Sequence, residues 1–247
     1  KLKGTTIKNT TYNESLGFTE WTLKNGIKVV VRPSALKADE VMLTATSKGG
    51  KSMLKVEESQ QADLLATVMQ YSGIGKFPAT DLSKQLSGKS AYASVGVGNY
   101  EHSVYAGGSP KDIETILQLV YLNFTSPRFD QTDLDNIKQM YVPYFRNMES
   151  DPNYIVGREF QKTIYGDHAR RQITSASQIE AINIPSLQAI HSKLFGYADD
   201  FRFVIVGNVD LNTLKPLVEK YIGSLPTSKK VEYAVVDDGV RFAEGNV

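Results

Sequence analysis

The chain has 247 residues, 41% of them hydrophobic and 22% charged, and a formal net charge of +1. Such values are ordinary for a globular protein and allow one large α/β domain or two small ones. Because the chain is almost neutral, it offers no strong field to attract nucleic acid or an anionic membrane surface. A nucleic-acid partner is therefore not expected, and the two tight basic pairs, Arg170-Arg171 and Lys229-Lys230, are predicted to lie on the solvated surface.

The chain contains no cysteine. This excludes thiolate zinc sites, iron–sulfur clusters, disulfides and cysteine nucleophiles. No apolar run is long enough to span a membrane, and the first residues carry neither a Met nor a signal-peptide core. The compartment stays open, and the bacterial periplasm or cell envelope is compatible with a chain that lacks cysteine.

The beginning of the chain predicts a polar arm followed by three strands. Residues 1–17 are rich in Thr and Asn and are expected to form a linker or an N-terminal arm. Alternating apolar residues predict strands over 18–23 and 27–32, joined by a tight turn at Asn25-Gly26, and a third strand over 41–46. These strands indicate an antiparallel sheet.

The rest of the chain predicts mainly helices. The clearest begins at Ser109, because Ser is a favourable N-cap and Pro110 suits the first turn, where its missing N–H needs no partner. A second long helix is expected to kink at Pro143. The other expected elements are, in chain order, a helix over 62–72 ended by Gly73 in the left-handed conformation, a short helix capped by Thr80 and running to Leu86, a hairpin of strands over 90–95 and 100–105, helices over 131–148, 152–164 and 185–195, a strand over 201–206, a helix over 211–222 and a strand-like run over 231–236.

The order of these elements indicates the fold class. Strands and helices partly segregate along the chain, and hairpins predominate over β-α-β units. The sequence therefore predicts an α+β domain with a largely antiparallel sheet packed against several helices.

The histidines of the chain are few and scattered. A hydrolytic zinc site needs three protein ligands and a carboxylate that takes a proton from the bound water. The chain has only His102, expected on a strand, His168, expected in a loop, and His191, expected on a helix. Isolated histidines of this kind are mostly structural or exposed, so we assign no catalytic, cofactor-binding or metal residue in this chain.

Glycine-rich sequences do not complete a nucleotide-binding motif. Gly88-Lys89-Ser90 resembles the end of a P-loop, but Ser83 stands where the first glycine is required. Gly96-Val-Gly98 begins a dinucleotide motif whose sixth position is Glu101. No Ser lies in a G-x-S-x-G sequence, and these glycines are expected to form turns.

Several short sequences along the chain nevertheless occur in a familiar order. Together they resemble the insulinase, pitrilysin and mitochondrial processing peptidase family of zinc metallopeptidases, over about residues 18–226. The sequences that carry the resemblance are Leu23–Pro33, Gly49-Gly50, Gly73-Ile-Gly75, Gly107–Pro110, Tyr121–Asp130, Phe203–Asp210 and Tyr221–Pro226.

The resemblance implies a role without catalysis for this chain. In that family two halves, each of two similar α+β domains, close around a peptide, and the active half carries H-x-x-E-H. Here Leu64 and Val68 occupy the positions of the histidines and Thr67 that of the glutamate. The resemblance therefore implies a domain of the non-catalytic C-terminal half, with zinc and catalysis in the other half of the parent protein.

The domain boundaries and partners follow from the same resemblance. Residues 18–226 are expected to be the metallopeptidase-like domain, and residues 227–247 a linker and the start of a truncated following domain. Both ends are thus expected to be cut from a longer chain. The implied partners are peptide substrate and the catalytic half, which belongs either to the same chain or to a partner subunit.

Two alternatives remain open from the sequence. A scaffold or assembly subunit can use the same fold without any peptidase activity, and sequence upstream of Lys1 lacking H-x-x-E-H would favour it. An unrelated small-ligand-binding domain that uses Gly96–Gly108 is the other alternative. On the peptidase hypothesis, the isolated chain is predicted to bind no stoichiometric zinc and to cleave no peptide.

Overall fold

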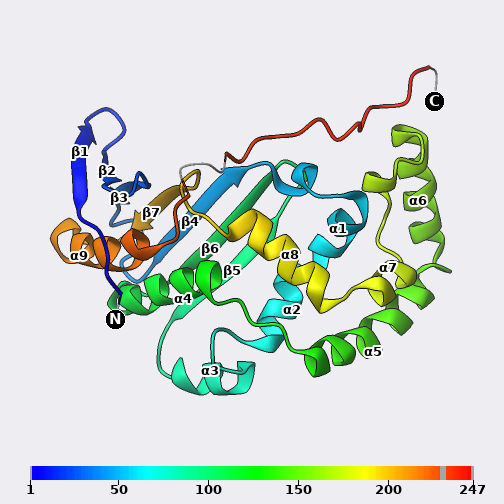
Figure 1. Ribbon diagram of the computed structural model, residues 1–247, viewed down its shortest axis with the longest axis horizontal. Helices are drawn as coiled ribbons and strands as arrows, with labels where there is room; N and C mark the ends of the chain where they lie inside the picture. The colour runs from blue at the N-terminus through cyan, green and yellow to red at the C-terminus, as the bar shows by residue number, and fades with distance from the viewer. Residues whose placement is uncertain (1, 229–231, 246–247) are drawn as a thin grey trace.

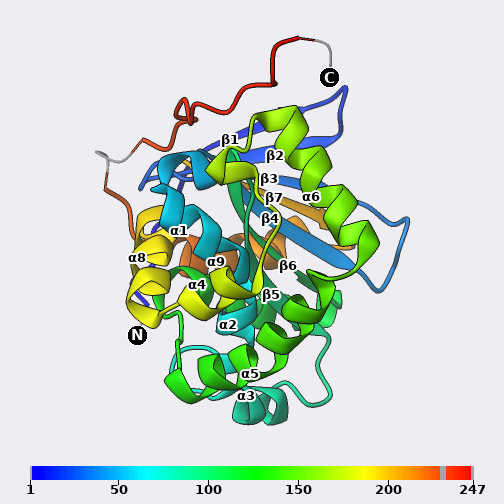
Figure 2. The same ribbon diagram turned by 90° about the vertical axis from the view of Figure 1, so that its right-hand side faces the viewer.

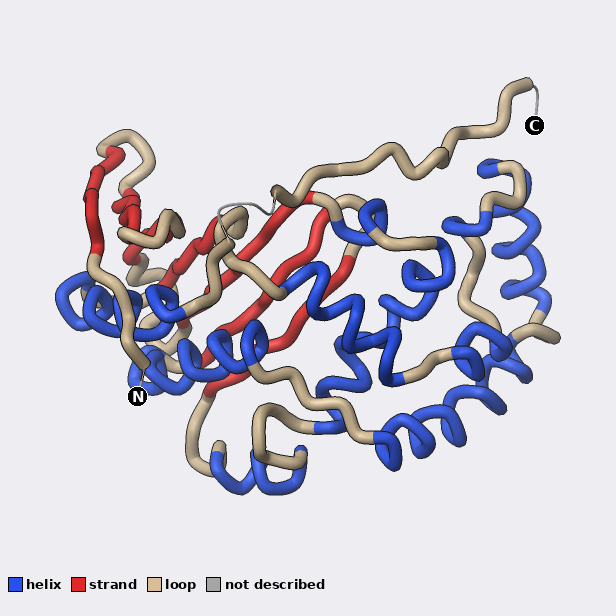
Figure 3. Tube along the Cα trace, in the orientation of Figure 1, coloured by secondary structure: helices blue, strands red, loops and turns tan. Residues whose placement is uncertain are grey.

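One mixed sheet of seven strands organises the domain. The computed structural model describes residues 2–228 and 232–245, and its strands lie in the order β1-β2-β3-β7-β4-β6-β5. Every neighbouring pair is antiparallel except β3 and β7, which are parallel. The prediction of an α+β fold with a largely antiparallel sheet is confirmed (Figure 3). The strands are β1 (Ile7–Asn13), β2 (Phe18–Leu23), β3 (Lys28–Pro33), β4 (Val41–Lys48), β5 (Ala91–Val97), β6 (Glu101–Gly108) and β7 (Arg202–Gly207).

The helices gather along the sheet and beyond one end of it. Figures 1 and 2 place α4 and α8 along the sheet, with β1 and α9 at one end of the molecule and α6 at the other. The α-helices are α1 (Val56–Gln61), α2 (Leu65–Ser72), α3 (Ala79–Gln85), α4 (Ile113–Thr125), α5 (Gln131–Met148), α6 (Pro152–Tyr165), α7 (Ala176–Ala181), α8 (Ile184–Phe195) and α9 (Leu211–Tyr221). Short 3₁₀ turns are η1 (Gly50–Met53), η2 (Ala62–Leu64), η3 (Pro110–Asp112), η4 (Ala169–Arg171) and η5 (Ile222–Ser224).

The core lies between the sheet and these helices. In β4 the side chains alternate, so that Val41, Leu43 and Ala45 are buried while their neighbours are not. Helix α8 buries Leu194 and Phe195 on its opposing face. Each fully buried side chain of this size stabilises the fold by about 1.5–3 kcal/mol through the hydrophobic effect.

Strand β1 differs from the predicted linker or arm over residues 1–17. It pairs with β2. The N–H of Thr5, just before β1, donates to the Glu219 backbone oxygen at 2.9 Å, and the N–H of Ile7, the first residue of β1, donates to the Glu219 side chain at 2.8 Å. Most side chains of β1 are exposed, because it is an edge strand that extends past the core. A strand without a buried face has no hydrophobic alternation, so only its hydrogen-bond partners reveal it.

Three details of the predicted helices also differ. Ser109 stands at the N-cap position of a 3₁₀ turn, η3, but its side chain makes no capping hydrogen bond. Thr80 lies inside α3, whose N-cap residue is Pro78. Gly73 has a positive φ of 90°, but its ψ of −152° is not that of a left-handed helix. Helix α5 contains Pro143 and runs on to Met148, and the predicted kink at Pro143 stays a prediction.

Strand β7 occupies the middle of the sheet. It pairs in parallel with β3 and antiparallel with β4. Although β3 and β4 follow each other in the chain, they are separated in space by β7, which comes from near the far end of the sequence.

Candidate functional site

The first turn of α2 and the turn before it hold Leu64, Thr67 and Val68, the three residues predicted to stand at the positions of the zinc-peptidase motif. Val68 is fully buried in the core, whereas Leu64 and Thr67 are half-buried. Both half-buried residues line a cavity of about 590 Å³. Its other walls come mainly from α5, and the full lining is Asp63, Leu64, Thr67, Met140, Tyr141, Tyr144, Phe145, Thr174 and Ile179.

These residues do not fit a zinc ion. Leu64 and Val68 are hydrocarbon side chains and Thr67 offers a neutral hydroxyl, whereas zinc prefers imidazole, thiolate and carboxylate ligands. The carboxylate in the cavity lining, Asp63, is ion-paired with Lys51. Across residues 2–228 and 232–245, no three His, Cys, Asp or Glu side chains lie close enough to hold a metal ion. The cavity is suited to apolar and aromatic contacts.

His102 on β6 is buried among aromatic rings. Its Nδ1 accepts a 3.3 Å hydrogen bond from the Gly50 N–H, and its Nε2 has no hydrogen-bond partner among the described residues. The rings of Phe195, Phe201 and Tyr233 stand edge-on to it, with centroids at 5.4, 5.1 and 4.9 Å. Burial in this apolar setting lowers the pKa of His102 to about 4, since the charged form loses its hydration.

The other two histidines also serve the local structure. His191 on α8 places Nε2 at 2.7 Å from the Asn123 backbone oxygen, and burial lowers its pKa. His168 accepts a 3.2 Å hydrogen bond from the Arg170 N–H at the start of η4. His102 and His191 both pack on Phe195, but the three histidines form no metal-binding group within the described part of the chain.

The neutral, buried His102 predicts a loss of stability in mild acid. Its pKa is about 4 in the folded state, against the ordinary 6.5, so the unfolded chain binds the proton first as the pH falls. The free energy of unfolding should therefore drop by about 2 kcal/mol between pH 7 and pH 5 from this group. Urea unfolding at both pH values, followed by the fluorescence of Trp21, measures the drop. A His102→Gln variant with the wild-type pH dependence would refute the assignment.

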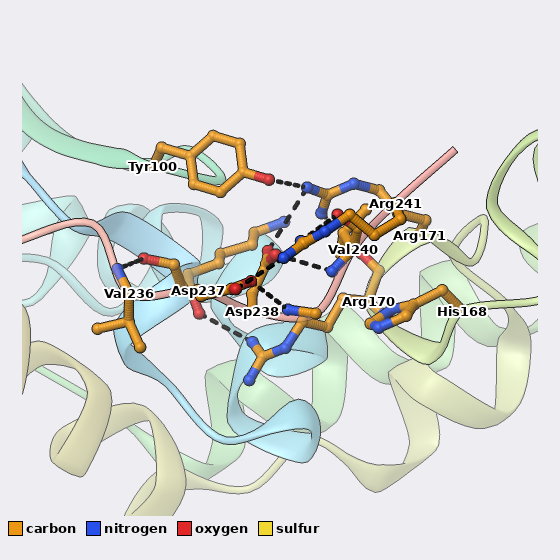
Figure 4. Close-up of polar contacts among 12 residues, drawn as sticks. Tyr100, His168, Arg170, Arg171, Val236, Asp237, Asp238, Val240 and Arg241 are labelled. Atoms are coloured by element: carbon orange, nitrogen blue, oxygen red, sulfur yellow. Dashed lines mark hydrogen bonds and ion pairs between the residues drawn. The ribbon is translucent and has the colours of Figure 1, made fainter. Parts of the chain in front are cut away.

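The basic pair Arg170-Arg171 is not the solvated pair predicted from the sequence. Arg170 donates hydrogen bonds to the backbone oxygens of Lys51 and Leu54, at 3.0 and 2.6 Å. Arg171 donates to the Tyr100 hydroxyl at 2.9 Å and forms an ion pair with Asp238 at 3.6 Å (Figure 4). Sequence reasoning missed these roles because the four partners Lys51, Leu54, Tyr100 and Asp238 are distant in the chain.

The C-terminal segment that provides Asp238 is not a strand where it is described. Val231, the first residue of the predicted run 231–236, lies outside the described residues, and 232–236 form no strand. Instead, the Tyr233 N–H donates to Asp200 at 2.7 Å and the Val236 N–H to the Ser52 hydroxyl at 3.0 Å. Side chains, not a neighbouring strand, satisfy this backbone.

The glycines of Gly96–Gly108 belong to the β5–β6 hairpin. A Cβ atom on Gly96 would lie 2.9 Å from the Tyr105 ring, and one on Gly107 would lie 2.9 Å from the Val41 backbone oxygen. Glycine is thus needed for close packing at these two positions. None of the helices in the described part of the chain is both long and apolar enough to cross a membrane.

Comparison with known proteins finds similarity to a peptidase M16 domain and to zinc proteases. The model of the peptidase M16 inactive domain matches residues 181–245. A zinc protease PQQL-like protein of Arabidopsis thaliana is 26% identical over 212 residues, which cover 85% of this chain and 20% of the relative. The probable zinc protease PqqL of Escherichia coli is 22% identical over 210 residues, covering 85% of this chain and 22% of the relative. The chain thus spans about a fifth of the length of these relatives.

Solved structures share the fold. The periplasmic protease PqqL from Escherichia coli matches with a TM-score of 0.80 at 20% identity, over 96% of this chain and 26% of that chain. A peptidase M16 inactive domain from Pseudomonas fluorescens matches with a TM-score of 0.70 at 19% identity, over 86% of this chain and 52% of that chain. The resemblance stated from the sequence is therefore confirmed: residues 181–245 match the peptidase M16 inactive domain, and the chain is homologous to the PqqL-like zinc proteases.

Proposed function

We propose that this chain is a non-catalytic domain of a zinc metalloendopeptidase and helps to enclose the peptide substrate. The observation that carries the proposal is that Leu64, Thr67 and Val68, the residues predicted to stand at the H-x-x-E-H positions, offer no zinc ligand, in a chain homologous to zinc proteases. The zinc and the catalytic base then belong to the catalytic half of the parent protein. That half, in the same chain or in a partner subunit, and the peptide are the proposed partners.

The cavity beside α2 supports a role in holding peptide side chains. Met140 and Tyr144 on α5 are about half exposed, and with Leu64 they present an apolar and aromatic surface. Such a surface binds apolar side chains of many sequences through burial rather than through charge. Closing it over a peptide also excludes water from the chamber in which hydrolysis takes place.

A periplasmic or cell-envelope location is proposed for the parent protein. A PqqL protein whose structure is similar is described as a periplasmic protease of Escherichia coli. The absence of cysteine agrees with this compartment, because no free thiol is exposed to an oxidising environment.

Metal analysis tests whether the zinc belongs to the catalytic half and not to this chain. After dialysis, the isolated chain should retain far less than one zinc per molecule and cleave no quenched fluorescent peptide, whereas the parent protein should retain one zinc and cleave it. About one zinc in the isolated chain would overturn the proposal. A parent protein with neither zinc nor cleavage would favour the scaffold alternative.

The role of the cavity predicts a specific kinetic effect. In the parent protease, Tyr144→Ala should raise KM for peptides with apolar side chains by about fivefold, while kcat changes little, because the lost contact forms equally in the ground and transition states. The matched control is Tyr12→Ala, since Tyr12 is an exposed tyrosine on the edge strand β1. Equal KM values for the two variants would argue against substrate binding in this cavity.

A further inference from the structure

The C-terminal segment 232–245, called the strap below, crosses the domain from the sheet to α6. Figure 1 shows it running without regular structure towards the end of the molecule where α6 lies. Along this path it contacts elements that are otherwise distant in sequence: β6, η1, η4 and α6. Most of its residues are exposed, so its position depends on a small number of anchoring contacts.

The first anchor of the strap is Tyr233, which is buried in the core. Tyr233 is buried against His102 and Phe201, with ring centroids at 4.9 and 5.8 Å, and its hydroxyl donates to the Tyr197 backbone oxygen at 3.2 Å. Removing a buried aromatic ring from such a site would create a cavity in the core. This end of the strap is therefore part of the folded domain.

The second anchor is the ion pair between Asp238 and Arg171 (Figure 4). The two side chains retain only 5% and 12% of their surface exposed, which is unusual for charged groups. The carboxylate of Asp238 also accepts a 3.1 Å hydrogen bond from the Val240 N–H, which fixes its orientation. Arg171 in turn lies over the rings of Tyr100 and Tyr165, at 5.7 and 5.9 Å. One arginine thus joins the strap, the β5–β6 hairpin and the end of α6.

The third anchor holds the far part of the strap on α6 and is largely open to solvent. The Phe242 ring stacks on Tyr165 with centroids at 5.5 Å, and the Ala243 N–H donates to the Ile164 backbone oxygen at 2.7 Å. Phe242 nevertheless remains 74% exposed. This contact alone buries little surface and is readily broken.

Helix α6 depends on these anchors because its own packing is incomplete. A polar cavity of about 320 Å³ is lined on one side by α6 residues, among them Tyr154, Arg158 and Lys162, and on the other by residues between Asp167 and Gln178. The direct ties across it are few, such as the 2.9 Å hydrogen bond from the Tyr154 hydroxyl to the Thr174 backbone oxygen. Local opening is favoured where buried apolar contacts are few.

We propose that the strap is a latch: Tyr233 holds it to the core, and the Asp238–Arg171 pair keeps it fastened across α6 until the pair opens. When the pair separates, α6 becomes free to move while the sheet stays folded, and η4 stays on η1 through the hydrogen bonds that Arg170 donates to Lys51 and Leu54. In a protease, such a latch would regulate how the two halves close, and that part of the inference rests on the proposed function. The latch itself does not depend on it. Helix α6 follows α5, which lines the aromatic cavity, after a short connection that includes Glu149. The Glu149 side chain accepts a hydrogen bond from the Ala176 N–H.

Hydrogen–deuterium exchange on the 247-residue chain tests the latch with two neighbouring carboxylates. Asp238→Asn removes the charge that pairs with Arg171, whereas Asp237→Asn removes an exposed carboxylate that pairs only with Arg241 among the described residues. In Asp238→Asn, exchange over α6, residues 152–165, should rise at least about tenfold, while β4 and β6 keep wild-type protection. In Asp237→Asn, both regions should match the wild type.

Two results would overturn the latch. One is equal exchange over α6 in the two variants, and the other is a rise in Asp238→Asn that affects β4 and β6 as much as α6. Phe242→Ala removes an exposed ring without disturbing the core and should raise exchange over the last turn of α6 alone. Because no zinc or substrate is present in this measurement, its failure rejects the latch only, whereas a parent protein without zinc rejects only the proposed function.

Discussion

Val68→His is expected to lower the free energy of unfolding by about 3 kcal/mol or more, although it restores one residue of the zinc-peptidase motif. Val68 is fully buried in the core cluster on α2. The larger imidazole overpacks this site and brings two polar nitrogens into an apolar environment without partners. Urea unfolding followed by Trp21 fluorescence gives the change directly.

Two controls separate the causes of this loss. Val68→Leu adds volume without polarity and should cost about 1 kcal/mol, which isolates the steric part. Thr67→His places the same imidazole at the preceding residue, which lines the open cavity, and should lower the free energy of unfolding by less than about 1 kcal/mol. Equal losses at positions 67 and 68 would show that the core around Val68 accommodates histidine. The former motif position would then remain a usable ligand position.

Phe195→Ala should destabilise the domain by about 3–5 kcal/mol. Phe195 is fully buried at the end of α8, where it packs on both His102 and His191, with ring centroids at 5.4 and 5.3 Å. The substitution leaves a cavity between the sheet and the helix layer and removes aromatic contacts that add to simple burial. In a thermal melt the midpoint should fall by about 10 °C.

The matched control for this variant is Phe160→Ala. Phe160 is 61% exposed on α6, so the same chemical change should alter stability by no more than about 0.5 kcal/mol. A comparable loss in both variants would mean that α6 is packed against a surface that makes Phe160 part of the core.

Local patterns in the sequence were sufficient to predict many of the helices and strands of the fold. Helices α4 and α8 repeat apolar residues at helical spacing, and the hairpin of β2 and β3 carries Asn25-Gly26 between two alternating runs. These signals involve residues close in the chain, which is why they predict elements and the antiparallel character of the sheet. The prediction that Leu64 and Val68 stand where metal ligands would be rests on adjacent residues too, and it stays a prediction.

Features that depend on distant partners were not predictable in the same way. The parallel pairing of β3 with β7 joins segments far apart in the chain, and neither strand alone indicates its neighbour. From the sequence, Arg170 and Arg171 look like any exposed basic pair. Only the fold brings the backbone oxygens of Lys51 and Leu54 to Arg170 and the Asp238 carboxylate to Arg171. The aromatic cavity also requires α5 to lie against α2, which periodicity does not specify.

The central position of β7 has a consequence for the order of folding. Without residues 202–207, the sheet is two separate ladders, β1-β2-β3 and β4-β6-β5, each with an open inner edge. Strand β7 supplies both missing rows of hydrogen bonds together with the buried side chains of Phe203 and Ile205. During synthesis the two half-sheets must therefore wait for a late segment, and in that interval their unpaired edges are open to strands of other molecules.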